Sequence, residues 1–529
     1  MTDSTIDSTI DSTDPRRRPP RIRLNSGAWS PLVDMIDVFP GHRGSSRDGE
    51  LELYDAPLGI RFEIEEALKS EPILRAETEW EGIHLSPLYV WKRDGRLHML
   101  YGSEAGQCYA VSDDAYRWTR PELGEVEFNG STRNNLVSRP CEGTTGIFED
   151  PSAPPEARFK AMGGRMYWWD PDTGEELSGE EPSRRIRAEQ EQADYSGPRA
   201  EIAGDMLAWT SPDGLRWTPL PEPLARRPVN GGISARYDEH RGGYFAYIQL
   251  MGYPAGVLDG IGVNRLEQGM QIRTIGFSRT DDFTSWPAPK LVHHPDTGDP
   301  PDISFYGANY FPYPGRDDLH GMLIPVYHQI ASTIDGQIAF SRDGLYWSRP
   351  ERRPILPLGD EGDGDECMAH FWRSGLVELP DGYWACPYAA FSVIHDCPAD
   401  KVPELFPLRQ PQQIRWARWR PHRFCGIRAS VEGCFSLPSL FRVHDELRFN
   451  YRCEPGGWIQ VELLEKLPSL MLPDADPLPG FTFDECDRLT GDCEDRVVTW
   501  QGRSDISAAG EAVGIRVRML GAKLFAYRV

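Results

Sequence analysis

Apolar and polar residues alternate along many short stretches of the chain, and turn-forming residues separate these stretches. Leu97–Tyr101, Gln107–Ser112 and Gly243–Gln249 show this period of two, which is typical of strands with one buried face. The 3.6-residue spacing of an amphipathic helix is scarce. The pattern therefore predicts an all-β protein.

A seven-residue motif, Ser-x-Asp-Gly-x-x-Trp, recurs after strand-like stretches. Its clear copies are Ser211–Trp217 and Ser341–Trp347, with a degraded copy at Ser112–Trp118 and a stretched one at Ser278–Trp286. Asp-Gly between apolar runs indicates a tight hairpin turn, and the tryptophan is expected to fold back over the hairpin. Repeated hairpin units of this kind predict the blades of a β-propeller, and a structural turn is a better interpretation of the motif than a catalytic one.

The spacing of these units predicts five blades within residues 25–424. The fifth blade spans roughly Cys367–Phe391, and we expect the first apolar strand, near Leu32, to close it, since a ring that shares its end strands has no exposed edge. After the propeller the motifs stop and short alternating strands follow. Residues 425–529 are therefore expected to form a small antiparallel β-sandwich.

Two polar segments interrupt this pattern. The polar repeat at residues 1–24 predicts a disordered N-terminal tail, because it cannot bury enough apolar surface to offset the entropy of ordering. Residues 170–202, rich in Glu, Asp, Arg, Pro and Gly, predict a surface insertion at one end of the propeller.

Composition and charge narrow the classes of partner. The 529 residues carry a formal net charge of −24, which argues against nucleic acid or an anionic membrane surface as the main partner. Ten cysteines lack C-x-x-C or zinc-like spacing, and no apolar stretch is long enough for a secretory signal or a membrane span. A cytoplasmic protein with free thiols is expected, and the sequence allows a homo-oligomer.

Sixteen Trp and twenty Tyr supply flat faces for sugar rings, although they also suit blade packing.

Several strings resemble bacterial proteins identified as family 32-like glycoside hydrolases. The resemblance covers most of residues 25–529, and the strings that carry it are Tyr109–Ser112, Trp118–Gly124, Phe128–Ser131, Asn134–Val137, Phe305–Gly307, Ile338–Gly344, Pro479–Phe481 and Val498–Trp500. It implies the five-bladed propeller that families 32, 43 and 68 share, and glycosidase activity on a furanoside-type or related bond.

The resemblance also implies acidic residues at the inner ends of blade strands. Glycoside cleavage needs one carboxyl to protonate the leaving oxygen and a second group to attack carbon or activate water. Asp150, which precedes a proline, resembles the family's transition-state stabiliser, and an acidic turn is the alternative. Glu366, which precedes a cysteine, resembles the general acid, and Asp365 is an equal candidate. No metal or other cofactor is expected.

The nucleophile is the least defined part of the site, because the Trp-Met-Asn-Asp-Pro run of fructosidases is absent. Glu81, Asp34 or Asp37 are candidates, each with a surface or turn role as the alternative. Side chains suited to binding the sugar include two arginines, whose forks fit hydroxyls or a carboxylate but also fit acids between blades. The candidate binding residues are Trp80, Arg236, Arg273, Tyr306 and Asn309.

These features support three hypotheses. The first is a glycoside hydrolase with paired carboxylates acting on a carbohydrate substrate. The second is a carbohydrate-binding propeller without activity, and the third is a glycan phosphorylase or transferase, which needs a basic cluster near the funnel. A hydrolase built on Asp150 and the acids at 363–366 requires these side chains to share one cavity.

Overall fold

The computed structural model describes residues 27–45, 51–54, 56–138, 141, 144–191, 196–226, 229, 232–240, 242–251, 272–372, 374–397, 412–464 and 476–529. Nearly all regular elements in these ranges are β-strands, so the all-β prediction is confirmed. Among the described residues there is one α-helix, α1 (Glu181–Glu191), besides short 3-10 helices such as Met35–Asp37, Pro155–Ala157 and Ser507–Ala509. The predicted tail at residues 1–24 lies outside the described residues.

The first three groups of antiparallel strands follow one another along the chain. The first group consists of β7 (Ser86–Arg93), β8 (Arg96–Ser103) and β9 (Gly106–Ser112). The second consists of β10 (Thr144–Glu149), β11 (Phe159–Trp169), β12 (Glu176–Leu177), β13 (Glu201–Ser211) and β14 (Thr218–Pro219). The third consists of β15 (Ile233–Tyr237), β16 (Tyr244–Met251), β17 (Arg273–Thr280) and β18 (Lys290–His293).

The next two groups are joined into one ten-stranded sheet by a single parallel bridge between Ile334 and Met368. The fourth group consists of β19 (Ile303–Phe305), β20 (Asn309–Pro312), β21 (His320–His328) and β22 (Thr333–Ser341). The fifth consists of β23 (Met368–Phe371), β24 (Val377–Glu378), β25 (Trp384–Phe391) and β26 (Gln413–Trp419), completed by β5 (Leu68–Lys69) and β6 (Leu74–Arg75).

Apolar clusters join these groups in cyclic order. Buried side chains of the first group pack against the second, the second against the third, and the third against the fourth. The fourth group packs against the fifth, and the fifth packs back against the first. Each strand group therefore buries both of its faces, which suits the aromatic and β-branched side chains that the alternating pattern supplies.

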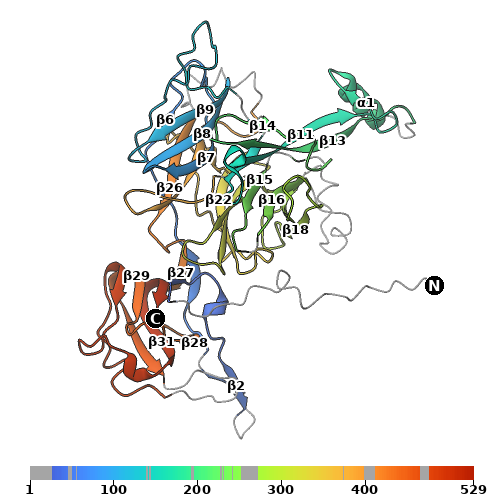
Figure 1. Cartoon of the computed structure of the whole chain (residues 1–529). Coiled ribbons are helices and arrows are strands. Elements are labelled where there is room, and N and C mark those ends of the chain that lie inside the picture. Colours follow the sequence, from blue (N-terminus) through green and yellow to red (C-terminus); the bar gives the residue numbers. More distant parts are fainter. Residues whose placement is uncertain are drawn as a thin grey trace, which may run out of the picture.

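A separate seven-stranded sheet contains the C-terminal strands (Figure 1). It consists of β1 (Ser30–Pro31), β4 (Arg61–Ile64), β27 (Cys425–Ala429), β28 (Gly433–Phe441), β29 (Arg448–Leu464), β30 (Asp492–Val497) and β31 (Ala512–Arg528), while β2 (His42–Ser45) and β3 (Leu51–Tyr54) form a hairpin of their own. The expectation that the strand near Leu32 closes the fifth blade is wrong. Ser30 pairs with Tyr527 of β31, and Leu32 is buried in the cluster of the C-terminal sheet, so β5 and β6 cover the edge of β26 instead.

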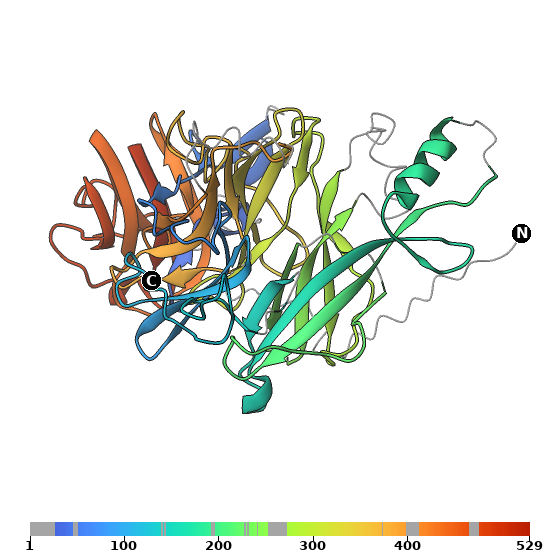
Figure 2. The same ribbon diagram turned by 90° about the horizontal axis from the view of Figure 1, so that it is seen from above.

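The described part of the insertion at residues 170–202 forms the end of a long hairpin. Strands β11 and β13 pair over their full lengths and carry α1 beyond them, on the side of the molecule away from the C-terminal strands (Figure 2). The helix is polar, and Arg185 pairs with Glu181 one turn earlier and with Asp170 at 2.6 Å. Such pairs stabilise an exposed helix whose sequence lacks an apolar face. No helix among the described residues is long and apolar enough to cross a membrane.

The recurring motif forms the same turn at its clear copies. In the first copy the Asp213 carboxylate accepts the N–H groups of Leu215 and Arg216 at 2.8 and 2.9 Å, and Gly214 has a φ of 83°. Asp343 makes the equivalent bonds in the second copy, where Gly344 has a φ of 77°. Glycine suits this left-handed conformation because it lacks a Cβ atom. The motif is therefore a structural turn in both copies.

Candidate functional site

Asp150 follows the last residue of β10 and is fully buried. Its carboxylate accepts hydrogen bonds from Lys160 Nζ at 2.6 Å, Tyr244 Oη at 2.8 Å and Ser152 Oγ at 2.6 Å. Burial by itself would raise the pKa of Asp150, but these three bonds keep that pKa below its usual value. Because the carboxylate is enclosed by its partners, Asp150 anchors β11 to β16 and is not open to a substrate.

Asp365 and Glu366 lie immediately before β23, and their side chains have different surroundings. Asp365 is fully buried and contacts Lys69 Nζ at 2.8 Å and Tyr388 Oη at 3.0 Å, which tie it to the interior of the fifth group. Glu366 is half-buried, and its carboxylate accepts the backbone N–H of Gly364 at 2.8 Å. Of these two candidates, Glu366 is the one that reaches solvent.

Glu81 is also a fully buried carboxylate. It accepts hydrogen bonds from Arg120 Nε at 2.6 Å, Tyr101 Oη at 2.7 Å and the backbone N–H of Glu77 at 2.9 Å. Burial would raise the pKa of Glu81, but the bonds from Arg120, Glu77 and Tyr101 lower it. The neighbouring Trp80 donates its indole N–H to Asn135 at 2.7 Å. Both residues therefore hold a loop onto the first strand group.

Three further candidates also serve the fold. Asp34 and Asp37 pair with Arg342 at 2.9 and 2.7 Å, and burial raises the pKa of Asp37. Asn309 is fully buried, where it accepts the N–H of Gly375 at 2.8 Å and its amide nitrogen lies 2.8 Å from the Cys386 sulfur. Asp37 and Asn309 are buried, whereas Asp34 lines a shallow pocket with its partner Arg342.

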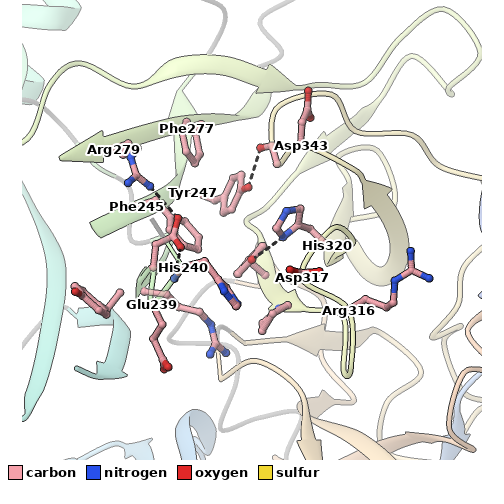
Figure 3. Close-up of a pocket in the computed structure, with 16 residues that line it drawn as sticks. Glu239, His240, Phe245, Tyr247, Phe277, Arg279, Arg316, Asp317, His320 and Asp343 are labelled. Carbon is pink, nitrogen blue, oxygen red and sulfur yellow. Dashed lines mark hydrogen bonds and ion pairs between the residues drawn. The ribbon is translucent and has the colours of Figure 1, made fainter. Parts of the chain in front are cut away.

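Arg236 is one of the residues that line a pocket between the third and fourth strand groups. Figure 3 shows this pocket. This β15–β21 pocket has a volume of about 300 Å³. It is lined by Arg236, Tyr237, Asp238, Glu239, His240, Phe245, Tyr247, Phe277, Arg279, Tyr310, Pro312, Arg316, Asp317, His320, Asp343 and Gly344.

The β15–β21 pocket combines aromatic walls with an arginine that has no ion-pair partner among the described residues. The rings of Phe245 and Phe277 are stacked with their centroids 6.2 Å apart and are partly exposed. Arg279 is paired with Asp238 at 2.9 Å, whereas no residue in the described ranges pairs with the guanidinium of Arg236. Aromatic faces beside a free guanidinium suit the apolar face and the hydroxyls of a sugar.

Arg273 and Tyr306 meet at the other end of the same strands. The guanidinium of Arg273 lies 4.8 Å from the ring centroid of Tyr306 and 5.5 Å from that of Tyr327. His395 Nε2 lies 2.7 Å from Tyr306 Oη, and His395 Nδ1 lies 2.7 Å from Asp396 Oδ1. We call these five residues the Tyr306 cluster. Two predicted binding residues from separate strand groups thus come together with a histidine and a carboxylate.

The carboxylate of the Tyr306 cluster is held from several sides. Asp396 Oδ2 accepts the hydroxyls of Tyr327 and of Ser332, the latter at 3.0 Å. Burial acts to raise the pKa of Asp396, but the hydrogen bonds from Tyr327, His395 and Ser332 lower it overall. The side chain of Asp396 nevertheless remains 60 % exposed. The cluster is therefore a charged group open to solvent rather than a closed ion pair.

Strand β21 runs from the β15–β21 pocket to the Tyr306 cluster. Its first residue, His320, lines the β15–β21 pocket, and Tyr327 near its end belongs to the Tyr306 cluster. At about 3.3 Å per residue, the seven steps between them span roughly 23 Å. Asp150 contacts Tyr244, which is adjacent in sequence to Phe245 of the β15–β21 pocket. Glu366 precedes β23, and β23 bridges to the start of β22.

Asp150 and Asp365 are both fully buried, so neither carboxylate opens to solvent, and the expectation that Asp150 and the acids at 363–366 share one cavity stays a prediction. Asp150 and Asp365 have different contact partners, Lys160 and Tyr244 for one and Lys69 and Tyr388 for the other. Asp150 follows β10, whereas Asp365 precedes β23. These contacts give no support to a hydrolase whose pair is Asp150 with Asp365 or Glu366.

Sequence reasoning gave His395 a core or surface role and did not single out Asp396. These residues follow β25 and precede residues outside the described ranges, and no motif surrounds them. Their partner Ser332 has a φ of 55°, which is uncommon for a residue with a side chain. An adjacent His-Asp pair after an apolar strand was the available signal. Within the described ranges, no three His, Cys, Asp or Glu side chains converge in a way that could hold a metal ion.

The chain matches no protein-family model and no curated protein. Among solved structures it is similar to a glycoside hydrolase at 12 % identity, with 68 % of this chain and 93 % of that chain covered and a TM-score of 0.39. It is also similar to a family 43 β-xylosidase/α-arabinofuranosidase from a compost microbial metagenome, at 11 % identity, 67 % and 94 % coverage and a TM-score of 0.37.

A third similar structure is the endo-arabinase from Bacteroides thetaiotaomicron, at 12 % identity, 68 % and 97 % coverage and a TM-score of 0.34. Because the identities and TM-scores are low, the function proposed below rests on this chain's own residues. The resemblance to family 32 stays a prediction.

Proposed function

We propose that the protein is a glycoside hydrolase with a five-bladed β-propeller and a small C-terminal β-sandwich. The cyclic packing of the five strand groups supports the propeller, because each group buries one face against the group before it and the other against the group after it. In this arrangement β5 and β6 close the fifth blade. The sandwich takes β1 and β4 from the N-terminal part of the chain and β27–β31 from the C-terminal part.

The Tyr306 cluster carries the proposal for function. Arg273, Tyr306 and Asp396 come from the third group, the fourth group and the segment after β25, so the fold gathers a cation, an aromatic hydroxyl and a carboxylate from distant parts of the chain. Sugar recognition needs hydrogen-bonding groups around an aromatic face, and glycoside cleavage needs groups that exchange protons with oxygen. The side chains of the Tyr306 cluster support both roles at one place.

Glu366 is the general acid in this proposal. The next residue, Cys367, packs with Tyr306 and Trp372 against one buried apolar cluster, and this nearness along the chain supports Glu366 as the acid. Glu366 is half-buried, whereas the neighbouring Asp365 is fully buried and paired with Lys69. A carboxylic acid at the edge of the site can protonate the glycosidic oxygen as the bond breaks.

The test is a screen of nitrophenyl furanosides and pyranosides followed by kinetics on Glu366→Gln. We expect the substitution to lower kcat/KM for 4-nitrophenyl glycosides by about 10²–10⁴-fold, the range of general acid catalysis. The loss should be much smaller for 2,4-dinitrophenyl glycosides, because this leaving group departs without a proton. Glu361→Gln, an exposed acid in the same loop, is the control and should retain activity. An absence of glycoside cleavage by the native protein would refute the proposed function.

A second candidate function, carbohydrate binding without catalysis, is favoured by the β15–β21 pocket. Its partly exposed rings and the unpaired Arg236 suit a neutral oligosaccharide. Arg236→Gln should raise the Kd of such a ligand at least tenfold, since hydrogen bonds to a charged group contribute about 1.5–3 kcal/mol. Titration calorimetry with arabinan and xylan oligosaccharides measures this change. Glu366→Gln, at the other end of β21, should leave that Kd unaltered.

A further inference from the structure

Three side chains of the Tyr306 cluster form a continuous hydrogen-bonded chain. Asp396 Oδ1 contacts His395 Nδ1 at 2.7 Å, and His395 Nε2 contacts Tyr306 Oη at 2.7 Å. The rings of Tyr306 and His395 meet edge to face with their centroids 4.9 Å apart. A hydroxyl bonded to a base, with the base oriented by a third group, is the arrangement that activates enzyme nucleophiles.

The proton positions in this chain follow from the partners of Asp396. Its Oδ2 atom already accepts the hydroxyls of Tyr327 and Ser332, so Oδ1 is the acceptor for the N–H of His395. An imidazole that donates from Nδ1 has its lone pair on Nε2. Nε2 therefore accepts the hydroxyl proton of Tyr306, which is the direction of proton transfer that a nucleophilic tyrosine needs.

The backbone around the chain is held in a strained conformation. Ser332 has a φ of 55°, and its carbonyl accepts the backbone N–H of His395 at 2.8 Å. Its hydroxyl oxygen also accepts the backbone N–H of Asp396 at 2.8 Å. Residues held in sparsely populated backbone conformations gather at functional sites, where the strain keeps reacting groups in place. Here one strained residue fixes the position of both His395 and Asp396.

Arg273 supplies a positive charge next to the hydroxyl that would lose its proton. Its guanidinium lies over the Tyr306 ring, and its Nε has no hydrogen-bond partner among the described residues. A cation over an aromatic ring favours negative charge that develops on that ring's oxygen. From these observations we infer that Tyr306 is the nucleophile of the proposed glycoside hydrolase, with His395 as its base and Asp396 as the positioning residue. The inference rests on the proposed function.

The reaction balances in two steps. In the first, Tyr306 Oη bonds to the anomeric carbon while the bond to the leaving oxygen breaks, the hydroxyl proton of Tyr306 moves to His395, and Glu366 gives its proton to the leaving oxygen. In the second, water attacks the anomeric carbon and gives a proton to Glu366. The bond between the anomeric carbon and the tyrosine oxygen breaks as water attacks, and that oxygen recovers its proton from His395. The products are the free sugar and the alcohol, and the enzyme returns to its starting state.

The first experiment needs no sugar. The native protein is treated with N-acetylimidazole, and acetylation of each tyrosine is followed by peptide mass spectrometry. Tyr346, which is 84 % exposed, is the reference, and half-buried Tyr306 is expected to react at least tenfold faster than it. Asp396→Asn should lower the rate at Tyr306 at least tenfold and leave the rate at Tyr346 unaltered. A Tyr306 that reacts more slowly than Tyr346 in the native protein overturns the inference, whether or not glycosides are cleaved.

The second experiment traps the intermediate. The 2,4-dinitrophenyl 2-deoxy-2-fluoro form of whichever glycoside the protein cleaves is added, and the labelled peptide is sequenced. Tyr306 is expected to carry the sugar, and Tyr306→Phe should lose at least 10³-fold in kcat while its circular dichroism stays native. A label on a carboxylate, or a folded Tyr306→Phe variant with native kcat, overturns the inference while the proposed function stands. An activated Tyr306 in a protein that cleaves no glycoside refutes the proposed function instead.

Discussion

Asp150→Asn is expected to lower the free energy of unfolding by about 3–5 kcal/mol, the cost of removing one partner from a buried ion pair. Lys160 is 7 % exposed at its side chain, and Asp150 is its counter-ion at 2.6 Å. Its ammonium also lies over the rings of Tyr244 and Phe283, which do not replace a carboxylate. The variant therefore keeps a buried charge without its counter-ion. Urea unfolding followed by tryptophan fluorescence measures the change.

A double variant separates charge from packing. Asp150→Asn combined with Lys160→Met removes both charges, and we expect it to be more stable than the single Asp150 variant, since apolar replacement of a buried pair is often neutral. A loss below 1 kcal/mol in the single variant would contradict the ion-pair interpretation. Folded Asp150→Asn should also keep its hydrolytic activity, in contrast to Glu366→Gln.

The pH dependence of this contribution has a definite sign. The folded protein holds the pKa of Asp150 below its usual value, whereas an unfolded chain has an aspartate pKa of about 3.9. Stability from the ionised carboxylate is therefore present above the unfolded-state pKa and is lost as pH falls through the folded-state pKa. The difference between native protein and Asp150→Asn should shrink on acidification through that range.

Local rules predicted the strands and turns, because they depend on neighbouring residues. The alternation in Gln107–Ser112 and the Asp-Gly turn at Gly214 require only a pleated strand and a positive φ, and both are found. The strand near Leu32 was misassigned because its pattern fits any open sheet edge. The choice between β26 and β31 depends on which distant residues bury Leu32.

The candidate site was harder to predict, because residue type does not show where a side chain points. Asp150 and Glu81 have the residue types of catalytic acids, yet each is enclosed by cations and hydroxyls from other strands. Arg273 and Tyr306 were predicted separately, and only the packing of β17 against β19 brings them to 4.8 Å. His395 belongs to no motif, and its contacts with Tyr306 and Ser332 span long stretches of chain.

Lys523→Met is expected to cost about 3–5 kcal/mol of unfolding free energy, because Lys523 is the buried cation that joins β31 to β4. Its side chain is 1 % exposed and lies 3.2 Å from Glu63 and 3.0 Å from Glu65, and it donates to the carbonyl of Ile64 at 2.8 Å. Methionine fills similar volume, but both carboxylates lose a cation and the Ile64 carbonyl keeps only its donor from Arg353. Lys92→Met, at an exposed position, is the control and should stay within about 0.5 kcal/mol.

Lowering the pH should remove most of the difference in unfolding free energy between the native protein and Lys523→Met. Burial acts to raise the pKa values of Glu63 and Glu65. Pairing with Arg61 and Lys523 nevertheless lowers the pKa of Glu63 overall, and pairing with Arg452 and Lys523 lowers that of Glu65. Their contribution is present above the unfolded-state glutamate pKa of about 4.3 and is lost as pH falls through the folded-state values. The gap in urea midpoint between native protein and Lys523→Met should therefore narrow on acidification. A gap that stays constant with pH would show that Lys523 acts through packing alone, and that the N-terminal strand is held to the C-terminal sheet by apolar contacts rather than by charge.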